Sequence, residues 1–207
     1  VYGISNAAQI SAGGSHACAV LDNGSIACWG NGVNGELGNG IAGTKLTPDT
    51  VKISGTFTQV SAGYYYTCAL KNDGTVWCFG DNDNGQLGDG STTDRFTAVQ
   101  VSSITTARQI STGENFSCAL LTDNTSRCWG YNSDYRLGDT TTTERLTPVE
   151  VEVNSNGTGS LGNIKSISSG FLNTCATLND NSTYCWGYVG YYVTGLSGTQ
   201  YAFAKEV

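Results

Sequence analysis

The sequence predicts an all-β protein, a β-propeller-type array of four blades with four short strands in each blade. Three observations support this fold class: a repeat every 50 residues, short apolar segments bounded by turn residues, and the lack of any sustained 3.6-residue periodicity. Four strands in a period of this length are typical of a propeller blade. We therefore expect residues 1–207 to form one domain, a partial or permuted ring without helices.

The period is carried by a Gln-x-Ser-x-Gly segment. It begins at Gln9, recurs at Gln59 and Gln109, and recurs in altered form at Ser166. These starting points divide the chain into repeats at 9–58, 59–108, 109–165 and 166–207. The third repeat is lengthened by a polar stretch that is typical of a loop insertion. The last repeat is short, and residues 1–8 complete it because their sequence is in phase with the end of the other repeats.

In the first repeat we expect strands over residues 8–12, 15–21, 25–29 and about 47–53. The second and third of these form a hairpin whose loop is residues 22–24. A three-residue hairpin loop favours a left-handed residue at its last position. The four repeats have Gly24, Gly74, Asn124 and Asn181 there, which are residue types that tolerate positive φ. Both faces of the hairpin are apolar, as expected of a sheet that packs between two neighbouring sheets.

Eight cysteines occur as four pairs, each pair ten residues apart across a hairpin loop. The register places the two cysteines of a pair opposite each other, at about 4.5 Å between Cα atoms, the short end of disulfide geometry. We predict one disulfide per blade: Cys18–Cys28, Cys68–Cys78, Cys118–Cys128 and Cys175–Cys185. Zinc is the rival interpretation, but the chain has no close Cys-x2-4-Cys knuckle. Disulfides in every blade predict a secreted or cell-surface protein.

The repeat reads G-x-x-x-x-C-A-L-x-x-x-G-x-x-x-C-W-G followed by G-x-x-x-x-G-x-L-G, and residues 63–88 carry it with Phe79 in place of Trp. This pattern resembles the regulator of chromosome condensation repeat family, and the cysteines resemble those of its secreted bacterial versions. The resemblance covers the whole chain and implies a β-propeller, usually one of seven blades. Tyr135 replaces the inner Gly in the third repeat, and residues 187–195 keep little of the loop in the fourth.

Composition excludes several classes of function. A net charge of -7 argues against nucleic acid and anionic membranes as partners. The family's nucleotide-exchange activity and chromatin binding are therefore not expected here. No apolar run approaches the roughly 20 residues that span a bilayer, so we expect no membrane insertion.

We expect no enzymatic activity and no cofactor. His16 is the only histidine, and cysteines in disulfides are not nucleophiles, which leaves no catalytic constellation. The loop at 81–85 resembles a calcium loop, but its Gly falls one place early and the distal Glu is absent, so we assign no metal.

A variable triplet follows the Gly that ends the first strand of each repeat. From it we predict a protein-binding surface, since a constant frame with variable aromatic residues is typical of recognition. The candidates are His16, Tyr64, Tyr65, Tyr66, Glu114, Asn115, Phe116, Phe171 and Leu172. In the alternative interpretation these residues pack between blades or line the channel, and His16 in particular is expected to be structural.

We therefore expect an extracellular, non-enzymatic module that acts through protein–protein contacts. The alternative is a subunit that self-assembles head-to-tail into a filament or surface layer, because the two ends of an open array have unpaired edges. The candidate edge residues for that assembly are Val1, Tyr2, Ile4, Phe203 and Val207. The family that this sequence resembles includes a secreted protein that inhibits β-lactamases. The resemblance therefore implies a third possibility, which is inhibition of a secreted enzyme.

Overall fold

The computed structural model describes residues 3–157, 159–189 and 200–207. In these ranges the strands form four antiparallel sheets, each a meander of four strands taken in chain order. The first two blades are β1 (Ala7–Ala12), β2 (His16–Leu21), β3 (Ile26–Gly30) and β4 (Lys45–Thr50), then β5 (Phe57–Ala62), β6 (Tyr66–Lys71), β7 (Val76–Gly80) and β8 (Arg95–Gln100). The last two are β9 (Ala107–Thr112), β10 (Phe116–Leu121), β11 (Ser126–Gly130) and β12 (Arg145–Glu150), then β13 (Ile164–Ser169), β14 (Asn173–Leu178), β15 (Thr183–Tyr188) and β16 (Gln200–Glu206).

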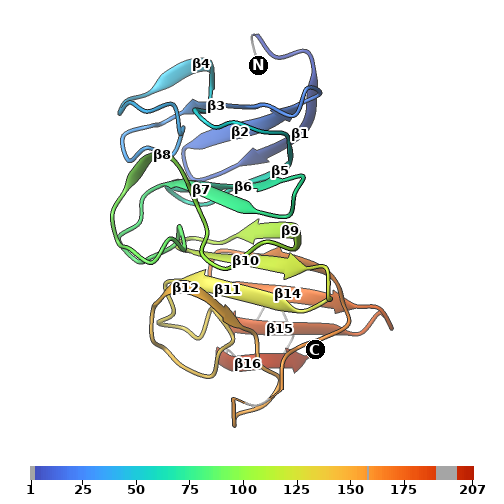
Figure 1. The fold of residues 1–207 in the computed structure, drawn as a ribbon. Helices are drawn as coiled ribbons and strands as arrows, with labels where there is room; N and C mark the ends of the chain where they lie inside the picture. The colour runs from blue at the N-terminus through green and yellow to red at the C-terminus, as the bar shows by residue number, and fades with distance from the viewer. Residues whose placement is uncertain (1–2, 158, 190–199) are drawn as a thin grey trace.

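The four blades stack face to face in chain order along an open arc (Figure 1). The first strands of neighbouring blades contact one another, β1 with β5, β5 with β9 and β9 with β13, and so form the inner edge of the arc. The ring is not closed, because blade one and blade four lie at opposite ends of the stack (Figure 1). No helix in the described ranges is long and apolar enough to cross a membrane.

The predicted hairpin register is confirmed. Cys18 lies opposite Cys28 and Val20 lies opposite Ile26. The turn positions have positive φ in every blade, from 66° at Asn124 to 83° at Gly74, with Gly24 and Asn181 between them. All four predicted disulfides are present, each with 4.1 Å between its Cα atoms.

The fourth strand begins and ends earlier than the expected 47–53. It spans Lys45–Thr50, and Val51 leaves the sheet so that its side chain can be buried between blades one and two. Pro48 stays inside this strand because the strand is the outer edge of its sheet, where a missing N–H leaves no ladder bond unmade.

Each blade packs through two different faces. The forward face carries the disulfide and packs on the next blade in the chain, whereas the rear face packs on the preceding blade. Between blades one and two, for example, Cys18, Val20 and Ile26 of the forward face meet Val60 and Phe79 of the rear face. All five side chains are at most 3% exposed, so the hydrophobic core of the molecule consists of these blade interfaces.

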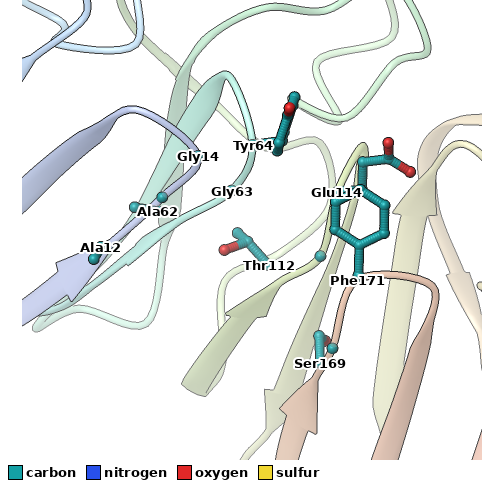
Figure 2. Close-up of a pocket in the computed structure, with 12 residues that line it drawn as sticks. Ala12, Gly14, Ala62, Gly63, Tyr64, Thr112, Glu114, Ser169 and Phe171 are labelled. Atoms are coloured by element: carbon teal, nitrogen blue, oxygen red, sulfur yellow. The ribbon is translucent and has the colours of Figure 1, made fainter.

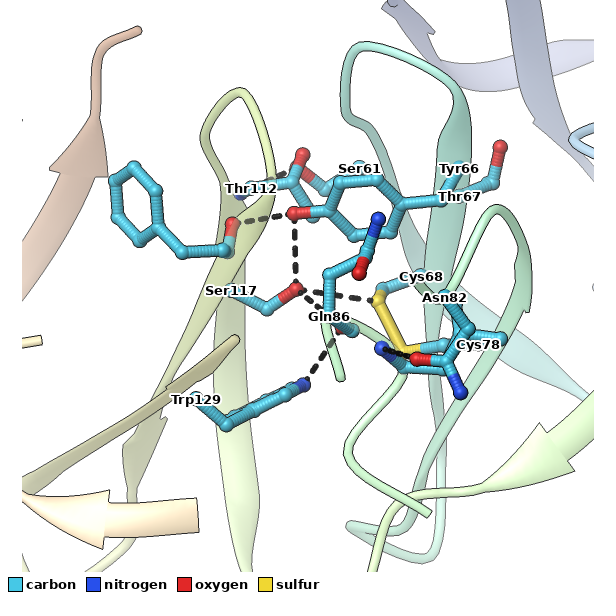
Figure 3. The surroundings of a disulfide bond; sticks show 12 residues. Ser61, Tyr66, Thr67, Cys68, Cys78, Asn82, Gln86, Thr112, Ser117 and Trp129 are labelled. Carbon is cyan, nitrogen blue, oxygen red and sulfur yellow. Dashed lines mark hydrogen bonds between the residues drawn. A yellow bond between two sulfur atoms is a disulfide. The ribbon is translucent and has the colours of Figure 1, made fainter. Parts of the chain in front are cut away.

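Polar contacts fix the same interfaces at the inner edge. The side-chain amide of Gln59 binds both backbone groups of Ile110, and Ser61 Oγ accepts the N–H of Thr112 at 3.1 Å. Farther out, the indole of Trp129 donates to the carbonyl of Gln86 at 2.9 Å, beside the Cys68–Cys78 disulfide (Figure 3). The glutamine and serine contacts recur between the other neighbouring blades, whereas the indole bond of Trp129 does not.

Candidate binding surface at the inner loops

The loop between the first and second strands of each blade begins with a glycine that cannot be replaced without a clash. A Cβ added to Gly63 would lie 2.1 Å from the ring of Tyr66, and one added to Gly113 would lie 2.0 Å from the ring of Phe116. The third residue of each of these triplets therefore folds back over the glycine. Tyr66 and Phe116 are 0% exposed and His16 is 5% exposed, so these three candidates lie in the interior between blades.

His16 is a neutral, buried histidine. Its Nε2 lies 2.7 Å from Oγ1 of Thr67, and that hydroxyl donates to the carbonyl of Glu36, so Nε2 carries the hydrogen and donates. Burial lowers the pKa of His16 to about 4. His16 therefore links blade one to blade two, in keeping with the structural role that the sequence predicted for it.

Whereas the third residue in blades one to three is buried, the first residue of each triplet lies at the surface. Gly14, Tyr64, Glu114 and Phe171, one from each blade, line the same pocket at the loops that follow the inner strands, and we call these four the mouth residues (Figure 2). Backbone hydrogen bonds hold them together: the N–H of Tyr64 donates to Glu114 O at 3.3 Å, and the N–H of Glu114 donates to Phe171 O at 3.2 Å.

Two aromatic rings meet across these loops. The rings of Tyr64 and Phe171 lie 5.8 Å apart between centroids at an interplanar angle of 86°, although they belong to blades two and four. Tyr64 also contacts Tyr65, at 4.4 Å between centroids. Tyr64 is 38% exposed and Phe171 is 55% exposed, so the pair is accessible to a partner.

The mouth residues surround an open pocket of about 440 Å³. Its walls are mainly backbone and small side chains, such as those of Ala12, Ala62 and Thr112 from the ends of the inner strands (Figure 2). A pocket of this size accepts one or two side chains of a protein partner.

One charged group at the mouth is held by a buried cation. Nη1 of Arg136 donates to the Glu114 carboxylate at 2.9 Å, and Nη2 donates to Asp134 at 3.0 Å. The guanidinium also lies 4.8 Å from the centre of the Tyr131 ring. Arg136 is only 4% exposed, so Glu114 is fixed in position rather than free to reach for a ligand.

The remaining candidates are dispersed. Asn115 and Leu172, the middle members of their triplets, are half-buried. Of the edge residues, Ile4 lies beside the rear face of blade one, Phe203 is half-buried in β16, and Val207 is 46% exposed. Val1 and Tyr2 lie outside the described residues.

The loop that resembles a calcium loop brings three carboxylates together. Those of Asp81, Asp83 and Asp94 can approach within 4.8 Å of one another. Gln86 Nε2 donates to Asp81 at 2.7 Å, and a backbone N–H donates to Asp94 at 2.8 Å. Burial, together with the charges of Asp94 and Asp83, raises the pKa of Asp81. Protein donors already engage two of the three groups, so we assign no metal here.

Sequence reasoning missed the glutamines of the inner strands. Gln9, Gln59 and Gln109 were used only to mark the period, whereas each binds the backbone of the next blade. The signal was present in the Gln-x-Ser spacing, because alternate residues of a strand share one face and can reach the same neighbour.

The fold and the mouth together define a class of protein, a propeller-type scaffold that presents variable loops on one face. One profile of the regulator of chromosome condensation (RCC1) repeat matches residues 7–36, 57–86 and 107–136, and a second matches 23–70 and 73–120. Together the matches run from residue 7 to residue 136, which is more than half of the chain. The chain belongs to the RCC1 repeat family.

Solved structures agree with this assignment. The chain superposes on human WBSCR16 with a TM-score of 0.82 at 19% identity, over 97% of this chain and 52% of that one. It superposes on Prp20p from Saccharomyces cerevisiae with a TM-score of 0.79 at 21% identity, over 100% of this chain and 52% of that one. The chain thus spans about half the length of these proteins, and at this identity they define the fold alone. No curated protein sequence matches the chain significantly.

Proposed function

We propose that the chain is a non-enzymatic, extracellular protein-binding module and that the mouth residues form its contact surface. The observation that carries this proposal is the Tyr64–Phe171 pair, two exposed rings from separate blades that meet edge to face. Aromatic side chains at the centre of a concave patch are the residues that most often dominate binding energy. The occupant we expect is a partner loop that inserts an apolar side chain beside these rings.

Two further observations support the proposal. All cysteines are in disulfides and no free cysteine is present in the structure, which fits an oxidising compartment outside the cytosol. Among the solved relatives, yeast RCC1 (Prp20) was crystallised with Kap60, and Prp20p was studied for its binding to Gsp1p and histones. We extend to this chain only the class of activity, which is binding to protein.

Head-to-tail self-assembly is the alternative. It would need the forward face of blade four to cover the rear face of blade one in the next copy. The described residues of that forward face include Asn173, Thr177 and Thr183, polar residues that are half-buried even without a partner. The mouth is therefore the better candidate for function.

The experiment uses a displayed library of disulfide-constrained peptide loops, selected on the immobilised chain. The affinity of the selected loops is then measured for the unmodified chain and for Tyr64→Ala, Phe171→Ala and Leu46→Ala. Leu46 is a control because it is apolar, 91% exposed and distant from the pocket lining. We expect each mouth substitution to weaken binding about tenfold or more and Leu46→Ala to leave it unchanged. Selected loops that tolerate both mouth substitutions would place the binding surface elsewhere.

A further inference from the structure

Four carboxylates gather where blade one meets blade two. Three of them, from blade two, have carboxylate oxygens within 4.8 Å of one another: Asp81, Asp83 and Asp94. Glu36 of blade one lies against the same blade, since its carbonyl accepts the hydroxyl of Thr67 at 2.9 Å. We call Glu36, Asp81, Asp83 and Asp94 the acidic site. None of the ion pairs among the residues that the structure describes includes a member of this site.

Glu36 is the member whose charge is least satisfied. Its side chain is 0% exposed, and its Oε1 is buried without a hydrogen-bond partner among the described residues. The other oxygen, Oε2, accepts the N–H of Asn34 at 2.8 Å. Burial raises the pKa of Glu36, and the negative charges of Asp81 and Asp94 raise it further. A buried carboxylate among like charges is stabilised by a nearby cation, so the site is suited to a positively charged ligand.

Tyr65 connects the acidic site to the mouth. Its carbonyl accepts the N–H of Asp81 at 3.1 Å, and its ring lies 4.4 Å from that of Tyr64 between centroids. A hydrogen bond with Tyr64 raises the pKa of Tyr65, and the negative charges of Glu36 and Asp81 raise it further. The carboxylates therefore lie close enough to the exposed rings of the mouth for one partner loop to reach both.

The corresponding position of blade three shows which cation suits such surroundings. Arg136 precedes the Leu-Gly of its loop just as Glu36 does in blade one. Its guanidinium binds two carboxylates, those of Glu114 and Asp134, and lies 4.8 Å from the centre of the Tyr131 ring. The acidic site offers carboxylates beside an aromatic ring in the same way, with an acid in place of the arginine.

Two members of the site are held in place but are not saturated. Gln86 donates to Oδ2 of Asp81 at 2.7 Å, and the N–H of Asn82 donates to Oδ1 of Asp94 at 2.8 Å. A carboxylate accepts up to about four hydrogen bonds, so both can accept further donors. A calcium ion needs about six to eight oxygen ligands, whereas the planar fork of a guanidinium is matched by one or two carboxylates. The geometry favours arginine over a metal.

We propose that the acidic site binds an arginine side chain of the protein partner. This inference rests on the proposed function, because one partner loop places its apolar residue beside Tyr64 and its arginine beside Asp81. Asp83 is exposed and Asp81 is half-buried, so both are within reach of the guanidinium, and Glu36 adds its negative charge. The net charge of -7 favours the approach of such a basic partner.

The first test uses a probe that does not depend on the mouth. N-acetyl-arginine amide is titrated into the isotope-labelled chain at low salt, and NMR follows the N–H signals of Tyr65, Asp81 and Asp83. N-acetyl-citrulline amide is the matched ligand, with nearly the same shape and no charge. We expect saturable shifts with the arginine compound and at least tenfold weaker binding of the citrulline compound. Equal binding of the two compounds would overturn the proposal.

A charge-removing variant assigns the binding to these carboxylates. Glu36→Gln combined with Asp81→Asn keeps the shape of both side chains. The chain itself has Gln86 and Asn31 at these positions of other blades, so we expect the variant to fold. We expect it to bind the arginine compound about tenfold or more weakly than the unmodified chain does. Unchanged binding would place the arginine elsewhere.

The control variant, Asp22→Asn combined with Glu206→Gln, removes the same charge elsewhere. Both residues are exposed and lie outside the acidic site and the pocket lining. We expect this variant to bind the arginine compound as the unmodified chain does. Equal weakening in the two variants would show that only the overall charge attracts the probe, which would overturn the proposal. Displacement of the probe by calcium below about 1 mM would also overturn it, since the site would then belong to a metal ion.

The peptide loops selected on the chain separate this proposal from the proposed function. A selected loop is made again with citrulline in place of its arginine. We expect this change to weaken binding to the unmodified chain about tenfold and to leave binding to the charge-removing variant nearly unchanged. Selected loops without arginine, or an equal loss on both chains, would overturn the arginine site even if binding depends on Tyr64. Binding of the arginine compound together with loops that tolerate Tyr64→Ala would instead overturn the mouth and support the acidic site.

Discussion

The side-chain amide of Gln59 binds the backbone of Ile110 twice, accepting its N–H at Oε1 and donating from Nε2 to its carbonyl, both at 2.9 Å. Gln109 binds Ile167 in the same way, at 3.0 and 2.8 Å. The amide thereby takes the place of a neighbouring strand for one residue. The inner edge of the array is thus held by paired hydrogen bonds at a fixed spacing.

Gln59→Ala should therefore weaken the interface between blades two and three. The substitution leaves a part-buried donor and acceptor of Ile110 without protein partners, so we expect the free energy of unfolding to fall by about 1–3 kcal/mol. Gln100→Ala is the control, since Gln100 is exposed and lies on the outer strand of the same blade. Chemical denaturation measures both changes. An equal effect of the two substitutions would mean that water replaces the amide at no cost.

Two glycines of one loop separate backbone strain from packing. Gly88 and Gly90 both have positive φ, 68° and 85°, so Ala at either position is strained by about 1–2 kcal/mol. Only at Gly88 does the added Cβ also collide with the Trp129 indole, while at Gly90 the nearest atom is 3.8 Å away. We expect Gly88→Ala to lower the free energy of unfolding by about 1–3 kcal/mol more than Gly90→Ala. Similar values would show that the indole moves aside.

His16 should make stability depend on pH. Its folded pKa of about 4 lies below the ordinary value of 6.5, so the unfolded chain binds the proton first as the pH falls. The part of the unfolding free energy that depends on a neutral His16 is fully present above pH 6.5 and is lost as the pH falls from about 6.5 to 4. From pH 7 to pH 5 the loss is about 2 kcal/mol.

His16→Phe tests this prediction, because blade three has Phe116 at the same position. Carboxylates contribute to the pH dependence of both proteins, so the informative quantity is the difference between their unfolding free energies at each pH. We expect the free energy of unfolding of the variant, relative to that of the unmodified chain, to rise by about 2 kcal/mol as the pH falls from 7 to 5. A difference that is constant with pH would contradict a buried neutral histidine.

Intact mass tests the disulfides. Alkylation of the unfolded chain without reductant should add no mass, whereas alkylation after reduction should add eight groups. Uptake of eight groups without reductant would refute all four bridges.

Loss of one bridge should also cost stability. Replacing Cys68 and Cys78 together by Ala should lower the free energy of unfolding by about 3 kcal/mol through loop entropy alone. The matched pair Cys175 and Cys185 closes a loop of the same length but lies on a less covered face. We expect a smaller total loss there, because the loop contribution is equal and less packing is removed. An equal loss at both pairs would show that burial adds nothing to the bridge.

The sequence was sufficient for the features that repeat along the chain. The turn residues Gly24 and Asn124 and the pairing of Cys18 with Cys28 followed from hairpin geometry, which depends only on local spacing. The burial of the individual triplet residues could not be predicted from local spacing. Tyr64 and Tyr66 share a residue type and lie two positions apart, yet one is exposed and the other is buried. The difference arises because Tyr66 folds over Gly63, a contact that depends on the loop's three-dimensional course.

The exposed face of blade one was also beyond sequence reasoning. Ile10 has the same residue type and register as Ile110, and nothing in its immediate sequence distinguishes an interior blade from an end blade. Exposure there is set by whether another sheet stacks on it, which is a property of the whole array. The polar substitutions in the fourth repeat were the one local sign that the two ends differ.

The glutamine clamp has a consequence for how such proteins change over evolutionary time. In this clamp one blade supplies the side chain and the next supplies only backbone, so the two bonds themselves do not depend on the side chain of the receiving residue. A gene segment that encodes one blade can then be duplicated, deleted or recombined in steps of one repeat and still meet its neighbour correctly. Tyr64 and Phe171 take no part in these bonds, so they can change while the joint between the blades is kept.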